Sequence, residues 1–256
     1  MGKLIRKATG LTVGVATLLA GLVLPMTASA ESASPIDASP IIHYSFDNAL
    51  TSKTIANEGS AANSDATLSG DATVANGQIS LTGSQTISVP TTAIAGKRDV
   101  TVSIWLKNNY GNGNTAAAYI GAAKTGNYPA NGYWLLNPAN PSGYAKSVMT
   151  NATVADPDNS PWGTEVGPGS TNAATTGTKA TSDLALYTTV ISGTNSTMSF
   201  YLNGKQVGDV TYTIPAGGLT NYGDLVAYIG KSSYADPNSK LDVDDYAVYD
   251  TAISAA

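Results

Sequence analysis

Apolar and polar residues alternate over short segments along most of the chain, and turn-forming Gly, Pro, Asn and Asp residues separate these segments. A two-residue period of this kind predicts β-strands that bury one face. No window shows the 3.6-residue period of an amphipathic helix. The predicted strands cover residues 41–46, 73–81, 86–90, 99–107, 116–122, 132–137, 144–150, 184–192, 197–210, 225–231 and 241–250. The pattern therefore favours an all-β protein of the sandwich or barrel type.

Segment 197–210 contains the pair Asn203-Gly204, which predicts a tight hairpin turn. Both central positions of a type I′ turn need positive φ angles, and Asn and Gly tolerate them. A longer stretch, residues 151–183, contains several Pro and Gly residues and little strand pattern. A loop of this length inside a compact domain often has a function, and this one carries Trp162.

The first 30 residues have the features of a secretory signal peptide. Basic residues precede an apolar run, and Ala-Ser-Ala at 28–30 forms a small-residue cleavage site. A membrane anchor is the alternative, but the apolar run is short for a spanning helix of roughly 20 residues. We therefore expect a secreted, extracellular protein that has no membrane partner after cleavage. A Ser/Pro-rich linker (31–40) would then precede a single domain (41–256).

The charge of the chain narrows the range of partners. The formal net charge is −5, and cleavage would remove three positive charges and lower it to −8. Nucleic acids and anionic membrane surfaces attract basic proteins, so we expect neither as a partner. The chain has no cysteine, and an exported domain without disulfides must be stabilised by its core or by bound ions.

The sequence predicts no catalytic residues. His43 is the only histidine, and no Gly-x-Ser-x-Gly motif accompanies it. Glycoside hydrolysis needs two carboxylates on either side of one bond, and Glu58 and Glu165 fall in predicted loops. Asp244 and Asp245 are adjacent in a predicted strand, where neighbouring side chains point in opposite directions. We therefore do not expect enzymatic activity within this chain.

An ordered set of segments resembles the laminin G-like, concanavalin A-like lectin superfamily, in the form found in secreted bacterial proteins. These segments are HYSFDN (43–48), an Asn/Asp-rich stretch (56–70), DVTVSIWLK (99–107), FYLNGKQVG (200–208), AYIGK (227–231) and VDDYAVYDTAIS (243–254). The resemblance implies a jelly-roll sandwich of two antiparallel sheets. The chain departs from the family in the strand before the hairpin, where a Trp and a His are usual, and at Asp242, where a Gly is frequent.

The resemblance also implies a structural calcium ion (Ca²⁺) between the first strand and the Val-Asp-Asp strand near the C-terminus. Calcium binds six to eight oxygen ligands from carboxylates, amides, carbonyls and water. The candidate ligands are Asp47, Asn57 and Asp244, with Asp245 as the alternative aspartate. The other interpretation is that these side chains only form hydrogen bonds within the protein.

Domains of this superfamily bind sugars or proteins, and sugars are bound by aromatic faces. Trp162, Tyr128 and Tyr110 lie in predicted loops and are candidates for such a surface, although loop aromatics also hold loops in place. Trp134 is a further candidate, but Tyr133 and Trp134 face opposite ways in a strand and one of them should lie in the core. Trp105 is expected to pack in the core.

The leading hypothesis is a secreted, non-catalytic carbohydrate-binding module whose partner is a glycan or polysaccharide. The alternative is an accessory or structural domain of a larger secreted glycoside hydrolase that acts on plant or host glycans. A third possibility is a surface adhesin that binds protein.

Overall fold

The computed structural model describes residues 38–124, 126, 128–129, 132–150, 161–169, 178–208 and 211–253. The predicted signal peptide and most of the predicted linker lie outside the described residues, as does much of the 151–183 stretch. None of the helices in the described ranges is long and apolar enough to cross a bilayer.

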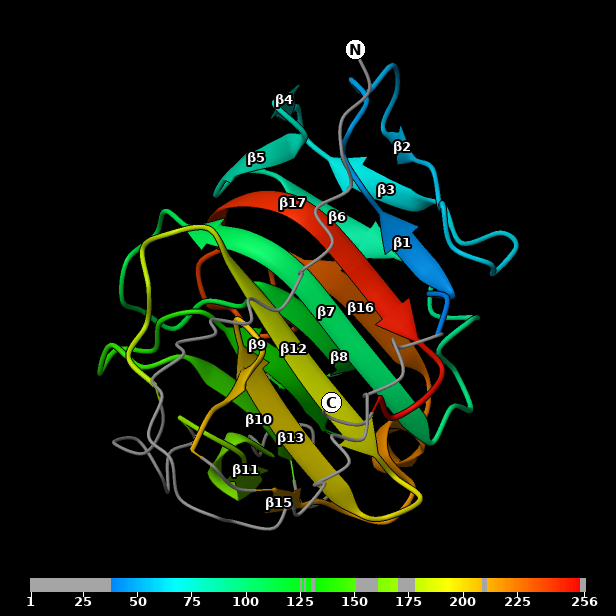
Figure 1. The fold of residues 1–256 in the computed structure, drawn as a ribbon, viewed down its shortest axis with the longest axis vertical. Coiled ribbons are helices and arrows are strands. Elements are labelled where there is room, and N and C mark those ends of the chain that lie inside the picture. Colours follow the sequence, from blue (N-terminus) through cyan, green and yellow to red (C-terminus); the bar gives the residue numbers. More distant parts are fainter. Residues whose placement is uncertain are drawn as a thin grey trace, which may run out of the picture. The chain divides into compact units, whose positions relative to one another are not determined.

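The described residues form two antiparallel β-sheets that face each other (Figure 1). The first sheet has the order β14-β13-β12-β7-β17-β5-β4, with β1 paired to β17 and β15 paired to β13. Its strands are β1 (Ile42–Tyr44), β4 (Thr73–Ala75), β5 (Gln78–Thr82), β7 (Asp99–Asn108), β12 (Ala185–Ser192), β13 (Thr197–Leu202), β14 (Lys205–Gln206), β15 (Tyr212–Thr213) and β17 (Lys240–Tyr249).

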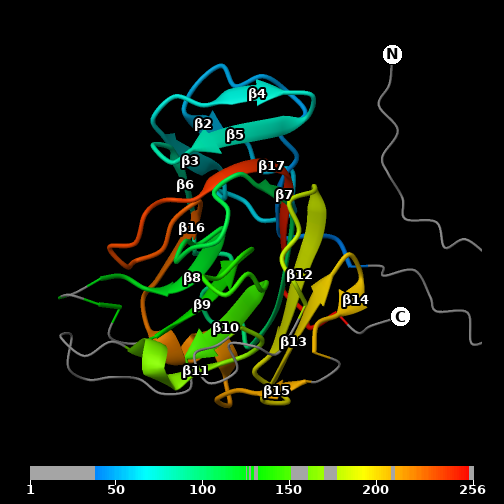
Figure 2. The ribbon, with the colours of Figure 1, turned by 90° about the vertical axis from the view of Figure 1, so that its left-hand side faces the viewer.

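The second sheet has the order β11-β10-β9-β8-β16-β6-β3-β2. Its strands are β2 (Thr54–Ile55), β3 (Ala66–Ser69), β6 (Thr86–Val89), β8 (Ala118–Ala122), β9 (Tyr133–Asn137), β10 (Lys146–Thr150), β11 (Glu165–Val166) and β16 (Leu225–Ile229). Short 3₁₀ turns, η1 (Pro161–Thr164) and η3 (Gly218–Tyr222), adjoin it. In the side view the strands β12 and β13 lie across from β8, β9 and β10 (Figure 2). The all-β jelly-roll prediction is confirmed.

The main hydrophobic core lies between the sheets. Strands β12 and β13 alternate between buried and half-buried residues, as strands with one covered face do. Trp134 is fully buried there, and its indole N–H donates to Ser147 Oγ over 3.1 Å. Ser147 Oγ in turn lies 2.8 Å from Thr189 Oγ1 on β12. These buried hydrogen bonds connect the second sheet to the first, and each of the three side chains has a hydrogen-bond partner.

The predicted strands are found close to their expected positions. Segment 73–81 is divided by a turn into β4 and β5. Asn203 and Gly204 have φ angles of 52° and 78°, which confirms the predicted hairpin turn. Glu165 was expected in a loop, but it lies in the short edge strand β11 and is only 3% exposed. Strand β11 pairs with β10 opposite Thr150, and the Glu165 carboxylate lies against Tyr133 and Lys146.

Trp105 was expected in the core, and this expectation is wrong. It is 38% exposed, because its neighbours Ile104 and Leu106 occupy the inward-facing positions of β7. The period of two decides which residues share a face, and here the apolar indole takes the outward position.

Strand β17 contains a β-bulge at the two adjacent aspartates. Its register against β7 shifts between Val243 and Tyr246, so one extra residue lies between these two buried side chains. Asp244 and Asp245 are both half-buried rather than one buried and one exposed. The expectation that they point in opposite directions is therefore wrong, because a bulge interrupts the alternation of a regular strand.

Candidate ligand-binding cleft

A cleft of about 450 Å³ lies on the second sheet, on the face opposite the main core. Its volume falls in the range of roughly 300–1,000 Å³ that is common for small-ligand sites. Tyr133 lies on this side of β9, whereas Trp134 lies on the core side of the same strand. The lining residues are Asn114, Thr115, Tyr128, Tyr133, Leu135, Asn137, Lys146, Trp162, Glu165, Tyr234 and Asp236.

Tyrosine rings form the floor and one wall of the cleft. Tyr133 is stacked on Tyr119 of β8 with ring centroids 5.6 Å apart. Tyr234 meets the Tyr133 ring edge-on at 5.5 Å, and Tyr128 lies 5.9 Å from Tyr234. Contacts of this geometry hold aromatic rings in fixed orientations. Trp162 on η1 lines the cleft and is 50% exposed, so part of its indole is accessible there.

Two glycines permit the close packing behind Tyr133. Gly121 pairs with Tyr133 across β8 and β9, and a Cβ at Gly121 would lie 2.4 Å from the Tyr133 Cβ. Gly132, immediately before Tyr133, has a φ of 97°, which favours glycine. The local sequence therefore fixes where the Tyr133 ring enters the cleft.

A network of hydrogen bonds holds the polar floor of the cleft. The Tyr133 hydroxyl donates to Glu165 Oε1 over 2.7 Å, and the Tyr234 hydroxyl donates to the Tyr133 oxygen over 3.3 Å. Lys146 Nζ lies 2.7 Å from Glu165 Oε2. Burial and the neighbouring Glu165 carboxylate raise the pKa of Tyr133 well above its usual value. The Tyr133 hydroxyl is therefore a hydrogen-bond donor rather than an acid at neutral pH.

Asp236 and Asn114 supply polar groups at the rim of the cleft, and both are exposed. Loss of solvent around Asp236 raises the pKa of its carboxyl group, and the positive charge of Lys146 opposes this shift. The cleft thus combines aromatic faces with an amide and a carboxylate at its edge. Such a surface suits a ligand that has both apolar C–H faces and hydroxyl groups.

The structure brings together two of the four aromatic residues named as ligand contacts. Trp162 and Tyr128 both line the cleft. Trp134 does not, because it is buried in the core. Tyr110 also lies outside the lining; its ring is 6.0 Å from Lys240 Nζ, and its backbone N–H donates to Asn108 Oδ1.

Several cleft residues were not identified from the sequence. Alternation in β9 indicated that one of Tyr133 and Trp134 faces away from the core, but it could not say which. Tyr234 and Asp236 lie in a turn-rich connection that has no repeating pattern, and Lys146 is an ordinary polar residue of a strand. No local signal would have placed these residues beside Trp162.

The four candidate calcium ligands lie near the paired ends of the domain. Strand β1 pairs with β17, as expected from the resemblance. Asn57 Oδ1 accepts hydrogen bonds from the backbone N–H groups of His43 and Gly59, at 2.8 and 3.0 Å. Asp245 Oδ1 lies 2.8 Å from His43 Nε2, and Asp244 Oδ2 accepts a 3.4 Å hydrogen bond from Gln78.

In the structure, hydrogen bonds within the protein engage three of these four side chains. Asn57 uses its oxygen within the loop, and Asp47 is exposed. In the described part of the chain, no group of three or more His, Cys, Asp or Glu residues is arranged to hold a metal. The cationic partner closest to Asp245 is His43, whose ring nitrogen forms the hydrogen bond. The calcium site stays a prediction.

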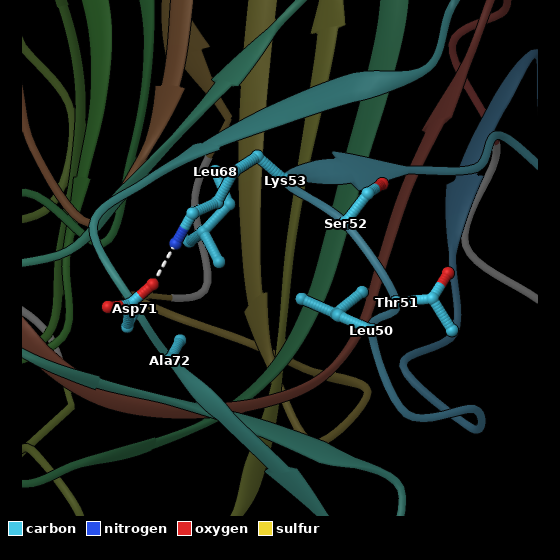
Figure 3. Close-up of a pocket in the computed structure, with 7 residues that line it drawn as sticks. All are labelled: Leu50, Thr51, Ser52, Lys53, Leu68, Asp71 and Ala72. Carbon is cyan, nitrogen blue, oxygen red and sulfur yellow. Dashed lines mark hydrogen bonds and ion pairs between the residues drawn. The ribbon is translucent and has the colours of Figure 1, made fainter.

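A second hollow lies beside β2 and β3 (Figure 3). It has a volume of about 290 Å³ and is lined by Leu50, Thr51, Ser52, Lys53, Leu68, Asp71 and Ala72. An ion pair between Lys53 and Asp71 crosses it. It is more open than the first cleft and has no aromatic ring in its lining, so the cleft beside Trp162 is the stronger candidate site.

Comparison with known proteins agrees with this architecture. The profile of the concanavalin A-like lectin/glucanases superfamily matches residues 81–256. No curated protein sequence matches the chain significantly. Domain 4 of AbnA, an extracellular GH43 arabinanase from Geobacillus stearothermophilus solved with arabinotriose, has a TM-score of 0.61 at 19% identity. The alignment covers 85% of this chain and 95% of that domain.

Two further similar structures belong to larger proteins. The ligand-binding domain of botulinum neurotoxin serotype D, solved with N-acetylneuraminic acid, has a TM-score of 0.52 at 14% identity over 84% of this chain. Trypanosoma rangeli sialidase, solved with the inhibitor DANA, has a TM-score of 0.54 at 12% identity over 84% of this chain. The alignments cover 48% of the toxin domain and 31% of the sialidase. At these identities the likeness is one of fold.

Proposed function

Because this chain belongs to the concanavalin A-like lectin/glucanases superfamily, we propose that it is a secreted, non-catalytic carbohydrate-binding module. The observation that carries the proposal is the half-exposed indole of Trp162 beside the tyrosine-lined cleft. Sugar rings stack their C–H faces on exposed aromatic rings, and they direct hydroxyl groups to polar side chains at the edge. The Trp162 indole, with Asp236 and Asn114 at the rim, offers both kinds of contact.

The carboxylates of the cleft support binding rather than hydrolysis. A hydrolase needs one carboxyl group to donate a proton and a second to act as base or nucleophile. Glu165 is buried, and both of its oxygens are used, one by Tyr133 and the other by Lys146. Among the described residues of the lining, Asp236 at the rim is then the remaining acidic group. Secretion is supported by the signal-like N-terminus and by the extracellular arabinanase among the similar structures.

A glycan array followed by calorimetric titration tests the proposal. Trp162→Ala should weaken binding to any glycan found on the array by about thirtyfold or more, since aromatic hot-spot residues contribute about 2 kcal/mol or more. Trp105→Ala is the matched control, because it removes the other exposed tryptophan, which lies on the first sheet. Equal losses in the two variants, or an array without any binding, would contradict the proposal.

The same cleft could serve an accessory domain of a larger secreted glycoside hydrolase. The observation in favour is the overlap with 95% of an arabinanase domain that was solved with arabinotriose. The complete gene tests this alternative. A catalytic domain encoded in the same reading frame would support the accessory role, and its absence would favour a free lectin.

A further inference from the structure

The charges of the cleft indicate which sugars it can accept, and this inference rests on the proposed function. Among the residues that the structure describes, three charged side chains line the cleft: Lys146, Glu165 and Asp236. Lys146 and Glu165 form an ion pair of 2.7 Å at the floor, where Glu165 is 3% exposed and the Lys146 side chain is 18% exposed. These two charges cancel, so Asp236 at the rim is the remaining charge that faces a ligand.

Lys146 is not available to a negatively charged ligand. To bind a carboxylate in the cleft, its ammonium group would have to move away from Glu165. Glu165 would then be a buried carboxylate with no cationic partner, and this arrangement is costly in free energy. The one cation among the described lining residues is thus held by an acidic residue of the protein itself.

Other lysines near the second sheet are also placed away from the cleft lining. Lys231 Nζ lies over the ring of Tyr228 at 4.1 Å, and Lys179 Nζ lies over the ring of Tyr144 at 4.0 Å. Lys124 is exposed and does not belong to the described lining. No second cation is therefore found among the described residues of the cleft wall.

The internal segments outside the described residues contain no cationic residue. Residues 151–160 read NATVADPDNS and residues 170–177 read STNAATTG. The first segment contains two aspartates, and neither segment contains lysine, arginine or histidine. The single residues near Tyr128 in the chain that lie outside the described ranges are Thr125, Asn127, Ala130 and Asn131, which are uncharged. Any of these residues that reached the cleft would leave its charge unchanged or make it more negative.

We infer that the cleft beside Trp162 selects neutral oligosaccharides and rejects sugars that carry carboxylate or sulfate groups. A neutral sugar places its hydroxyl hydrogens on the Asp236 carboxylate and its C–H face on the Trp162 indole. An acidic sugar brings a second negative charge close to Asp236 without a cation to balance it, and such like-charge contacts strongly disfavour binding. Of the sugars in the similar structures, arabinotriose belongs to the accepted class and N-acetylneuraminic acid to the rejected one.

An array that contains neutral glycans and their acidic counterparts tests this inference on the full chain. Suitable pairs are lactose with sialyllactose, and methyl-esterified with free oligogalacturonides. The strongest signals should come from neutral glycans, and an acidic partner should bind at least about tenfold more weakly than its neutral form, as expected for adjacent like charges. Raising the salt concentration should reduce this difference, because salt screens exposed charges.

Asp236→Asn should raise the affinity for acidic glycans relative to neutral ones. Asp183→Asn is the matched control, since Asp183 is an exposed aspartate outside the cleft lining. Strongest binding to sialylated, sulfated or uronic glycans would overturn this inference and leave the proposed function intact. An array without signals would overturn the proposed function and, with it, the inference.

Discussion

His43 Nε2 lies 2.8 Å from Asp245 Oδ1, so a hydrogen bond joins two residues that are 202 positions apart in the chain. His43 belongs to β1, and Asp245 lies in the bulge of β17. The bulge places the carboxylate on the outer face, where the histidine ring of the paired strand also lies. In a chain without disulfides, this contact fastens the first strand of the domain to the last one.

The first prediction concerns the pH dependence of stability. The hydrogen bond to Asp245 raises the pKa of His43 above 6.5, with burial opposing it and the charges of Asp245 and Glu58 adding to it. A raised histidine pKa means that the protonated form stabilises the fold. This contribution is complete below about pH 6.5 and is lost as the pH rises through the folded-state pKa.

His43→Gln should therefore lower the free energy of unfolding more at pH 5.5 than at pH 8.5. Urea denaturation at the two pH values measures the difference. Lys97→Met is the control, because it removes a surface ion pair, the 2.9 Å contact between Lys97 and Asp250, that contains no histidine. A loss in His43→Gln that is the same at both pH values would show that the ring stabilises the fold only by packing.

The second prediction separates a structural role for Asn57 from a calcium-binding role. Its amide N–H groups donate to the carbonyl oxygens of Ile41 and Ala61 at 3.2 and 2.8 Å, while its oxygen accepts two backbone hydrogen bonds. Asn57→Ala leaves these backbone groups unpaired, so it should lower stability by about 1–3 kcal/mol. Thermal unfolding should show the same loss of stability, relative to the wild type, in the presence of calcium and in the presence of a chelator.

The calcium hypothesis gives a different pattern in the same experiment. A chelator would then lower the melting temperature of the wild-type protein, because removal of a bound ion shifts the folding equilibrium. Asn57→Ala would be insensitive to the chelator. Asn57→Asp keeps an acceptor oxygen but loses the amide donors. If Asn57 has only a structural role, this variant should be less stable than the wild type whether or not calcium is present. If Asn57 is a calcium ligand, adding calcium should restore the stability of the variant.

The sequence predicted the sheets better than the cleft, for a physical reason. Alternation within a strand is a local property, so most strands could be found from the chain alone. The choice of face depends on the partner sheet, and for this reason Trp105 and Trp134 were both misplaced. Very short strands such as β2 and β11 have too few residues to show a period.

The cleft depends on distant segments meeting on one face of the second sheet. Trp162 and Tyr128 could be named because aromatic residues in loops are unusual, and both line the cleft. Glu165 and Lys146 pair only because β11 adds to the edge of β10. A bulge such as that in β17 also leaves no clear mark in a sequence, since it appears as one extra residue in an otherwise regular strand.

The third prediction tests the hydroxyl group at the floor of the cleft. Tyr133→Phe keeps the ring contacts with Tyr119 and Tyr234 but removes the donor to Glu165. Because Glu165 is buried, losing one of its partners should lower stability by about 1–3 kcal/mol. Tyr228→Phe is the control, as it removes a hydroxyl from a half-buried tyrosine that stacks on the same Tyr119 ring. Urea denaturation of both variants provides the measurement, and equal effects would argue against the hydrogen-bond network.

The last prediction concerns the ion pair that neutralises the cleft. Lys146→Met leaves the buried Glu165 without its cation and should destabilise the protein by about 3 kcal/mol or more. Adding Glu165→Gln removes the unpaired charge, so the double variant should be more stable than the sum of the single losses predicts. A double-mutant cycle from urea denaturation measures this coupling. Additive losses would mean that the two side chains act independently.

Glu165→Gln alone has a further consequence for binding. The Lys146 ammonium group then loses its internal carboxylate while it still lines the cleft. Acidic glycans should consequently gain affinity in this variant relative to neutral glycans, as a freed cation can pair with a ligand carboxylate. Lys231→Met is expected to leave this preference unchanged, because Lys231 lies over Tyr228 and outside the described lining. An unchanged preference in Glu165→Gln would contradict the idea that the ion pair with Glu165 prevents Lys146 from binding acidic glycans.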